Sequence, residues 1–187
     1  MIYGLLFLQS EKVENEACQA VLMDSANRIK SMMVLYDKLY RSEKHHSMKI
    51  KDYLEPLLIE ILSLYTQTLS IEYRVAIEDF TVPADPLANM GIILTELITN
   101  SVKYAFVDDQ PARIELNVKK ENHQIIMIYE NNGKSVPEDF SVERSSGFGM
   151  ELISMLIQQF HGSIQIIRKK DDRGQNNGTR FIITLTV

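Results

Sequence analysis

The residues of this sequence whose types and spacing could do chemistry begin with Glu96, Asn100 and Lys103, within the apolar stretch GIILTELITNSVKYAF at 91–106. On a helix of 100° per residue these three fall within about 60° of one another. The pattern predicts a helix with one packed face and one face that presents an acid, an amide and a cation. Its packed face comprises Leu94, Leu97, Ile98, Ser101 and Ala105.

A polar stripe on an amphipathic helix is often only its solvated side, and i,i+4 or i,i+3 spacings also arise by chance. A solvated side gains from Lys and Glu but not from Asn, which prefers caps and turns to the middle of a helix. Asn100 therefore needs a reason that solvation does not supply. From these residues alone both interpretations stay open.

Three glycine-bearing stretches follow this helix: ENNGKSVP at 130–137, SSGFGMEL at 145–152 and NNGTRF at 176–181. Taken singly, each is ordinary turn chemistry. GFGMEL, however, ends a polar segment and opens a helix, where free backbone N–H groups can hold phosphate oxygens and glycine allows close approach. It is neither a Walker loop nor a dinucleotide fingerprint.

The bulk composition is that of an ordinary globular protein, because 45% of the 187 residues are hydrophobic and 24% are charged. A net charge of −5, with no basic cluster longer than RKK at 168–170, argues against nucleic acid as a partner. The single cysteine, Cys18, offers neither a disulfide nor a zinc pair, which favours a reducing compartment and a cytoplasmic location.

The apolar N-terminus MIYGLLFLQ lacks a basic region and a cleavage site, and it is too short to cross a bilayer. We therefore expect no signal peptide and no direct membrane contact in this segment. Its abrupt start suggests a piece of a longer protein.

The elements that must position the polar residues begin with two helices at 1–16 and 18–42, joined by a turn near Asn15. An apolar seam of alternating three- and four-residue steps runs along the second helix. Because two such helices make a thin core, we expect a four-helix homodimer through residues 1–42. The seam consists of Leu22, Ala26, Ile29, Met33, Tyr36 and Tyr40.

The remainder predicts an α+β fold with helices on one face of a mixed sheet. SEKHHSMK at 42–49 marks a boundary, so the expected domains are 1–46 and 47–187, and PADP at 83–86 is expected to be a turn. The expected helices are 50–68, with Tyr53, Leu57, Ile61 and Leu64 on one side, 91–106 and 148–160. The expected strands are 71–80, 112–120, 124–130, 162–170 and 179–187.

Four segments in this order resemble a known family: TELITNSVKYAF, NNGKSVP, GFGMELI and GTRF. They are similar to the N box, the two glycine boxes and the closing Gly-Thr segment of the GHKL (HATPase_c-type) ATP-binding domain of sensor histidine kinases. NRIKSMMVLYDKLYRS at 27–42 resembles the second dimerisation helix of the HisKA_2-type subfamily, whose acceptor box reads roughly HHRxKNN.

The resemblance implies a GHKL-type α/β sandwich that binds ATP with Mg²⁺. It implies that Asn100 is the magnesium ligand, that Glu96 polarises the attacking group, and that Lys103 lies near phosphate. It places Thr179 at the adenine end of the pocket and a short lid at about 138–146. The remaining implied nucleotide-binding residues are Tyr104, Asn131, Gly133, Gly147, Gly149 and Met150.

The sequence departs from the family in two ways. The first glycine box normally reads Asp-x-Gly-x-Gly, with Asp accepting a hydrogen bond from the adenine amino group, but here Asn131 and Ser135 replace the Asp and the second Gly. An amide oxygen still accepts but loses charge assistance, worth about 1 kcal/mol. Glu130 does not substitute, because neighbouring side chains on a strand face opposite ways.

The second departure is that nothing in the chain resembles the acceptor box. His45 and His46 lie in the polar linker, His123 in a hairpin-like turn and His161 near a helix end, so we expect none of them to carry the phosphoryl group.

The resemblance implies an ATP-dependent protein histidine kinase. The γ-phosphoryl group would pass to a histidine upstream of this chain and then to an aspartate in the receiver domain of a response regulator, so the chain alone would not autophosphorylate. A degenerate dimeric scaffold that docks a regulator is the alternative, supported by Asn131 and Ser135. A GHKL protein that phosphorylates serine is a third possibility, which the paired N-terminal helices weaken. The chain would be cytoplasmic, or the cytosolic part of a membrane-bound sensor.

Overall fold

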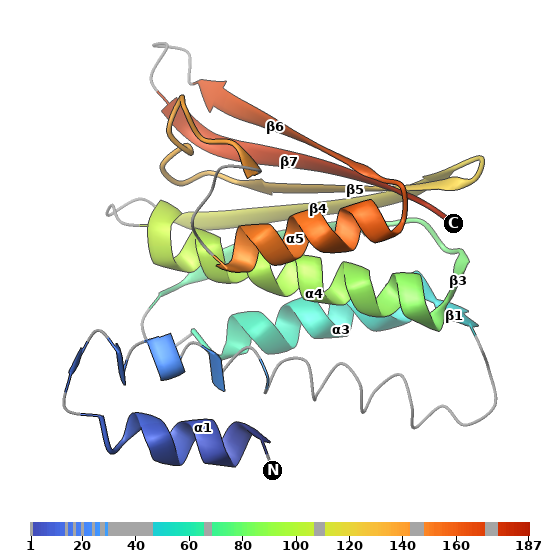
Figure 1. The fold of residues 1–187 in the computed structure, drawn as a ribbon. Coiled ribbons are helices and arrows are strands. Elements are labelled where there is room, and N and C mark those ends of the chain that lie inside the picture. Colours follow the sequence, from blue (N-terminus) through green and yellow to red (C-terminus); the bar gives the residue numbers. More distant parts are fainter. Residues whose placement is uncertain are drawn as a thin grey trace. The chain divides into compact units, whose positions relative to one another are not determined.

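The protein forms two compact units, Met1–Lys44 and His45–Val187, in a computed structural model (Figure 1). The structure describes residues 2–13, 47–65, 69–106, 111–142, 148–170 and 176–187, together with scattered positions between 15 and 29.

The first unit contains helix α1 (Ile2–Ser10), which is shorter than the predicted helix. It ends where Ser10 Oγ donates to the Phe7 carbonyl at 2.7 Å, satisfying an acceptor of the last turn. Asn15 Oδ1 then accepts from Cys18 N at 3.1 Å, the bond of a helix N-cap, and the described positions from Glu16 to Ile29 are helical. Of the predicted seam, Leu22, Ala26 and Ile29 are described, with Ala26 fully buried, whereas Met33, Tyr36 and Tyr40 lie outside the described residues.

The second unit is built on a five-stranded sheet in the order β2-β4-β5-β7-β6. Strands β2 and β4 are parallel and the other neighbours are antiparallel, so the sheet is mixed as predicted. The strands are β2 (Ile71–Ile77), β4 (Ala112–Glu121), β5 (Gln124–Asn131), β6 (Ser163–Lys170) and β7 (Asn176–Thr186).

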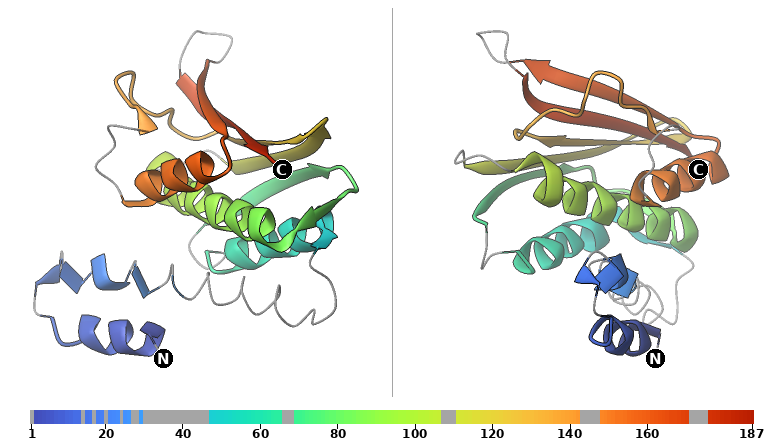
Figure 2. Two further views of the ribbon diagram at one scale, coloured as in Figure 1. Left: turned by 45° about the vertical axis from the view of Figure 1, so that its right-hand side comes forward. Right: turned by 60° about the vertical axis from the view of Figure 1, so that its left-hand side comes forward.

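Three helices cover one face of this sheet, α3 (Ile50–Ser63), α4 (Ala84–Asn100) and α5 (Phe148–Gln159), as the two views of Figure 2 show. Alternate residues of β5 point into the core between the layers and are buried: Ile125, Met127 and Tyr129. This is the α+β architecture that the sequence predicts. Among the described residues, no helix is long and apolar enough to cross a membrane.

The packed side of α3 follows the prediction for Tyr53, Leu57 and Ile61, but Leu64 is 57% exposed. Leu64 lies at the C-cap, one residue beyond the helix, where the chain leaves the core.

The sequence missed a small second sheet, in which β1 (Ser47–Lys49) pairs antiparallel with β3 (Thr81–Pro83). Strands of three residues are too short to show an apolar alternation. The prediction of a turn at PADP was wrong, because Pro83 is the N-cap of α4 and the other three residues form its first turn. Pro86 fits there, because the first N–H groups of a helix have no intrahelical partner.

The helix predicted at 91–106 changes its pitch after Asn100. Residues Ser101–Ala105 form a π-helical turn, η1, closed by the bond from Phe106 N to the Ser101 carbonyl at 3.0 Å. Such turns are rare and are often found at functional sites. Since a π-turn advances by less than 100° per residue, the helical wheel places Lys103 and Tyr104 only approximately.

Candidate functional site

The polar residues of the α4–η1 segment differ in burial. Glu96 is only 1% exposed, whereas Asn100 and Lys103 are half-buried and Tyr104 is 69% exposed. The prediction of an open polar face was therefore wrong for Glu96. The reason is that α4 packs against both α3 and α5, which cover its flanks.

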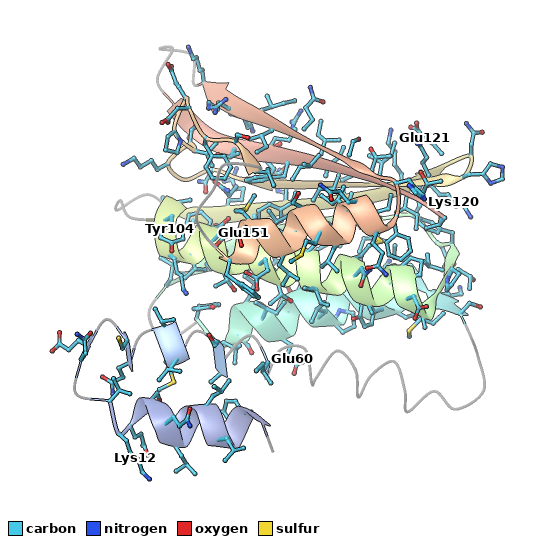
Figure 3. All side chains as sticks on the ribbon, viewed as in Figure 1. Lys12, Glu60, Tyr104, Lys120, Glu121 and Glu151 are labelled. Carbon is cyan, nitrogen blue, oxygen red and sulfur yellow. The ribbon has the colours of Figure 1, made fainter. Side chains whose placement is uncertain are left out.

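The end of α4 meets the beginning of α5 through Asn100 and Met150. Asn100 Nδ2 lies 3.5 Å from Met150 Sδ, within reach of a weak hydrogen bond to sulfur. Figure 3 shows Tyr104, on η1, and Glu151, in the first turn of α5, at the same end of the helical layer. Gly149 and Met150 are buried there, and Gly147 lies outside the described residues.

Asn100, the predicted magnesium ligand, lies at the end of α4. With Nδ2 turned toward Met150, the amide oxygen Oδ1 is the atom of Asn100 that could bind a cation. No group of three or more His, Cys, Asp or Glu side chains in the described part of the chain could hold a metal ion. A single neutral oxygen suits Mg²⁺ that takes its other ligands from phosphate and water.

Asn131, at the end of β5, is tied to the end of α4 by a buried hydrogen-bond network. Its Nδ2 donates to Ser101 Oγ at 3.1 Å, and its Oδ1 accepts from Gly133 N at 3.2 Å. Tyr129 OH also donates to Ser101 Oγ, at 2.8 Å, and burial raises the pKa of this phenol, so it stays a neutral donor. The network joins the first glycine box to the N box. Helical periodicity placed Ser101 only on the packed face, and no sequence pattern singled out Tyr129.

Thr179 lies beside Asn131, because the two residues are partners in the register of β5 and β7. Thr179 is 1% exposed, and its Oγ1 accepts from Val136 N at 3.1 Å. Ser135, which replaces the second glycine of the box, donates from Oγ to the Gly178 carbonyl at 2.6 Å. This departure from the family therefore adds a bond between the loop and β7.

Two glycines are required where backbone segments approach closely. A Cβ on Gly133 would lie 2.5 Å from the carbonyl oxygen of Ala105, at the end of η1. Gly178 has φ +107°, and a Cβ there would lie 2.0 Å from the Asn131 carbonyl oxygen. Larger side chains at either position would push the first glycine box away from η1 or β7.

Glu130 points away from this network, as the alternation of a strand requires. It forms ion pairs with Lys169 and, from Arg180 Nε to Glu130 Oε2, at 2.6 Å. Burial alone would raise the pKa of Glu130, but the hydrogen bonds and charges of Lys169 and Arg180 outweigh burial and lower it. Glu130 therefore does not replace the missing aspartate.

Arg168, on β6, holds the loop that follows Ser135, and sequence reasoning noted it only as part of a short basic cluster. Its Nη2 donates at 2.6 Å to the carbonyl of Pro137 and at 2.9 Å to that of Glu138. Further bonds reach the carbonyls of Val136 and Phe140. The first residues of the predicted lid are thus anchored, and residues 143–147 lie outside the described part.

Two family descriptions match this chain. Residues 88–187 match the family described as "Histidine kinase-, DNA gyrase B-, and HSP90-like ATPase", and residues 1–65 match HisKA_2, described as "Histidine kinase". The second match extends beyond the N-terminal unit into α3.

Curated relatives include the sensor histidine kinase PdtaS of Mycolicibacterium smegmatis, 22% identical over 83% of this chain and 31% of the relative. PdtaS of Mycobacterium tuberculosis is 22% identical over 92% of this chain and 34% of the relative. The chain thus spans about a third of the length of these relatives. A solved histidine kinase domain from the blue-light-activated kinase EL346 of Erythrobacter litoralis has a TM-score of 0.73 at 16% identity, covering 99% of this chain and 92% of that one.

Proposed function

The chain belongs to the family of histidine kinase-, DNA gyrase B- and HSP90-like ATPases, and from this premise we propose that it is the ATP-binding catalytic region of a two-component sensor histidine kinase. It would pass the γ-phosphoryl group of ATP to a histidine upstream of this chain. A receiver-domain aspartate of a response regulator would then accept the group. This chemistry would take place on the cytosolic side, in a cytoplasmic protein or in the cytosolic part of a membrane-bound one.

The observation that carries the proposal is the buried network that links Asn131 through Ser101 to the helix turn carrying Asn100. It brings together a candidate base-reading group and a candidate metal ligand from segments about 30 residues apart in the chain. The network thus fixes the end of α4, which carries Asn100, relative to the first glycine box.

The base would lie against Asn131 and Thr179, which are neighbours in the sheet register. Gly133 would let the loop approach the end of η1 closely. The triphosphate would lie between the end of α4–η1 and the N-terminus of α5, where backbone N–H groups favour anions. The residues proposed to line it are Lys103, Tyr104, Gly147, Gly149 and Met150.

Asn100 would bind magnesium through its amide oxygen. When bound, Mg²⁺ would neutralise charge on the phosphate oxygens. Glu96, one turn earlier on the same helix, would polarise the attacking group, and its burial would keep bulk water away from the carboxylate.

Calorimetry of MgATP binding to the 187-residue chain tests the proposal. We expect binding that is lost when EDTA removes the metal. No binding at millimolar ATP would favour the alternative of a dimeric scaffold that docks a regulator without nucleotide. Because the acceptor-histidine box is missing, incubation with labelled ATP should leave this chain unphosphorylated.

We also propose that residues 1–46 form a partial dimerisation hairpin and that residues 47–187 form the catalytic domain. Among the described residues of the N-terminal unit, three apolar side chains are more than half exposed, which is costly in a monomer and suits an interface between two copies. They are Leu5 at 56%, Leu8 at 55% and Val21 at 64%.

A further inference from the structure

We propose that Ser101 determines the base selectivity of the site, because it fixes the orientation of the Asn131 amide. This inference rests on the proposed ATP site and adds a positioning residue to it. A carboxylate presents oxygen whichever way it turns, whereas an amide presents oxygen one way and NH₂ the other. An asparagine at this position therefore needs a partner that holds it one way round.

The hydrogen bonds of Ser101 show that it must act as an acceptor toward Asn131. A serine hydroxyl has one hydrogen to donate and two lone pairs to accept. Its hydrogen goes to the Leu97 carbonyl at 2.9 Å, an oxygen that can only accept. Both lone pairs are then left for donors, and they receive Tyr129 OH and Asn131 Nδ2.

The other end of the Asn131 amide gives the same orientation. Gly133 N is a backbone donor, and it lies 3.2 Å from Asn131 Oδ1, so that atom must be the oxygen. Asn131 and Ser101 are 4% and 3% exposed, so water does not compete strongly for either group. Two independent partners therefore define the same amide orientation, which matters because Asn oxygen and nitrogen are assigned from such networks.

The fixed orientation has a consequence for the base. Nδ2 gives one of its two hydrogens to Ser101, on the side away from Oδ1's partners, while Oδ1 has a second lone pair that can accept another hydrogen bond. Adenine offers an amino group at C6, which would donate to that oxygen. Hypoxanthine carries a carbonyl oxygen at C6 instead, which would face Oδ1 without a hydrogen between them. Sites that leave a buried polar group unpaired discriminate strongly against such an analogue.

The test compares MgATP and MgITP, which differ at C6, by calorimetry on the 187-residue chain. We expect the unmodified chain to prefer ATP by about tenfold or more. In Ser101→Ala, Nδ2 loses its acceptor, and only the 3.2 Å bond from Gly133 N still holds the amide, so the amide can turn more readily and donate to the hypoxanthine oxygen. The ATP-to-ITP preference should then fall several-fold.

Thr95→Ala is the matched control. Thr95 is also buried on α4, and its Oγ1 donates at 2.8 Å to the carbonyl four residues earlier, as Ser101 does. This variant should lose a similar bond within the helix but keep the full ATP-to-ITP preference. Ser101→Ala combined with Asn131→Asp should regain the preference, because a carboxylate has no NH₂ to turn toward the base.

An unchanged ATP-to-ITP ratio in a folded, ATP-binding Ser101→Ala chain would overturn the inference while leaving the proposed function intact. The unmodified chain offers a readout that needs neither this variant nor nucleotide binding. The side-chain NH₂ signals of Asn131, identified by their loss in Asn131→Asp, should exchange slowly with solvent both with and without ATP. Rapid exchange in the nucleotide-free chain would contradict the bond to Ser101, even if no nucleotide binds.

Discussion

At the scale of single residues, the side chains around Asn131 show how a departure from a family motif can be accommodated. Ser135 uses its hydroxyl to bind the Gly178 carbonyl, and Asn131 uses its NH₂ to bind Ser101. Both replacements are buried polar groups that have hydrogen-bond partners, so neither carries the cost of an unsatisfied group. The two departures therefore do not by themselves indicate a degenerate site.

Asn100→Ala tests the proposed metal ligand. It should abolish the magnesium-dependent part of nucleotide binding in calorimetry while leaving the circular dichroism spectrum unchanged, because Asn100 is half-buried and bonds only weakly to Met150. Asn89→Ala is the matched control, since Asn89 lies on the same helix and also makes one long bond, 3.4 Å, to Gln159. Equal MgATP affinity in both variants would rule out the metal role.

The Glu130 ion cluster predicts a dependence of stability on pH. The pKa of Glu130 is lowered from its ordinary value of 4.5, so the stabilisation is fully present above that pH. It is lost as the pH falls through the lowered value of the folded state. Urea unfolding should show Glu130→Gln less stable than the unmodified chain at neutral pH, with the difference shrinking in acid. A difference that stays constant down to pH 3 would contradict the assignment.

At the scale of elements, α4 both packs in the core and positions residues of the site, and its last turns do both. Between Ile93 and Ile98 every residue is buried, and immediately afterwards the helix becomes the π-turn η1. The buried part packs between α3 and α5, and the end of the helix is tied to the loop after β5, where Lys134 N donates to the Ala105 carbonyl at 2.9 Å. Packing of α4 thus sets the position of the groups that follow it.

Leu97→Ala tests the packing of α4. Leu97 is 1% exposed, so truncation should lower the free energy of unfolding by about 2–5 kcal/mol. Leu64→Ala makes the same change at a residue that is 57% exposed and should shift stability by no more than about 0.5 kcal/mol. Similar losses for the two variants in urea denaturation would mean that α4 is not packed as described.

Arg168→Met tests the anchoring of the loop at residues 136–140. Methionine keeps the apolar stem but removes the donors to four backbone carbonyls. Hydrogen exchange should become faster at Phe140 N, which bonds to the Pro137 carbonyl at 3.1 Å, with little change in the strands. Arg74→Met, at an exposed arginine with one 3.7 Å ion pair, should leave the exchange of this loop unchanged. Equal exchange in both would refute the anchor.

At the scale of the whole molecule, the chain consists of two units with different expected roles. The second unit has an extensive core of its own, and the first exposes apolar side chains on a small helical scaffold. A unit with a full core should fold without its neighbour, whereas a thin hairpin gains stability from a second copy.

Sedimentation equilibrium tests this division. The 187-residue chain should be a dimer at tens of micromolar, and residues 45–187 alone should be a folded monomer that still binds MgATP. A stable monomer of the full chain at that concentration would contradict dimerisation through residues 1–42. A dimer of residues 45–187 would place the interface in the catalytic unit instead.

The sequence by itself determined the main helices and strands of the second unit. β-Branched runs predicted all five strands of the large sheet, and helical periodicity predicted α3, α4 and α5, because these patterns reflect burial on one side of a local element. The order of four short motifs was enough to indicate the family. The same patterns could not show the three-residue strands or the change of pitch at Ser101.

Only the tertiary structure decided which groups meet. Asn131 bonds to Ser101, 30 residues away in the chain. Arg168, on β6, bonds to four carbonyls of the loop that follows Ser135. Glu96 lies on the predicted polar stripe yet is buried, since its exposure depends on α3 and α5 and not on α4 alone. The periodicity of a sequence describes one element at a time, whereas contacts and burial at the site depend on the strand order and on how the helices pack against one another.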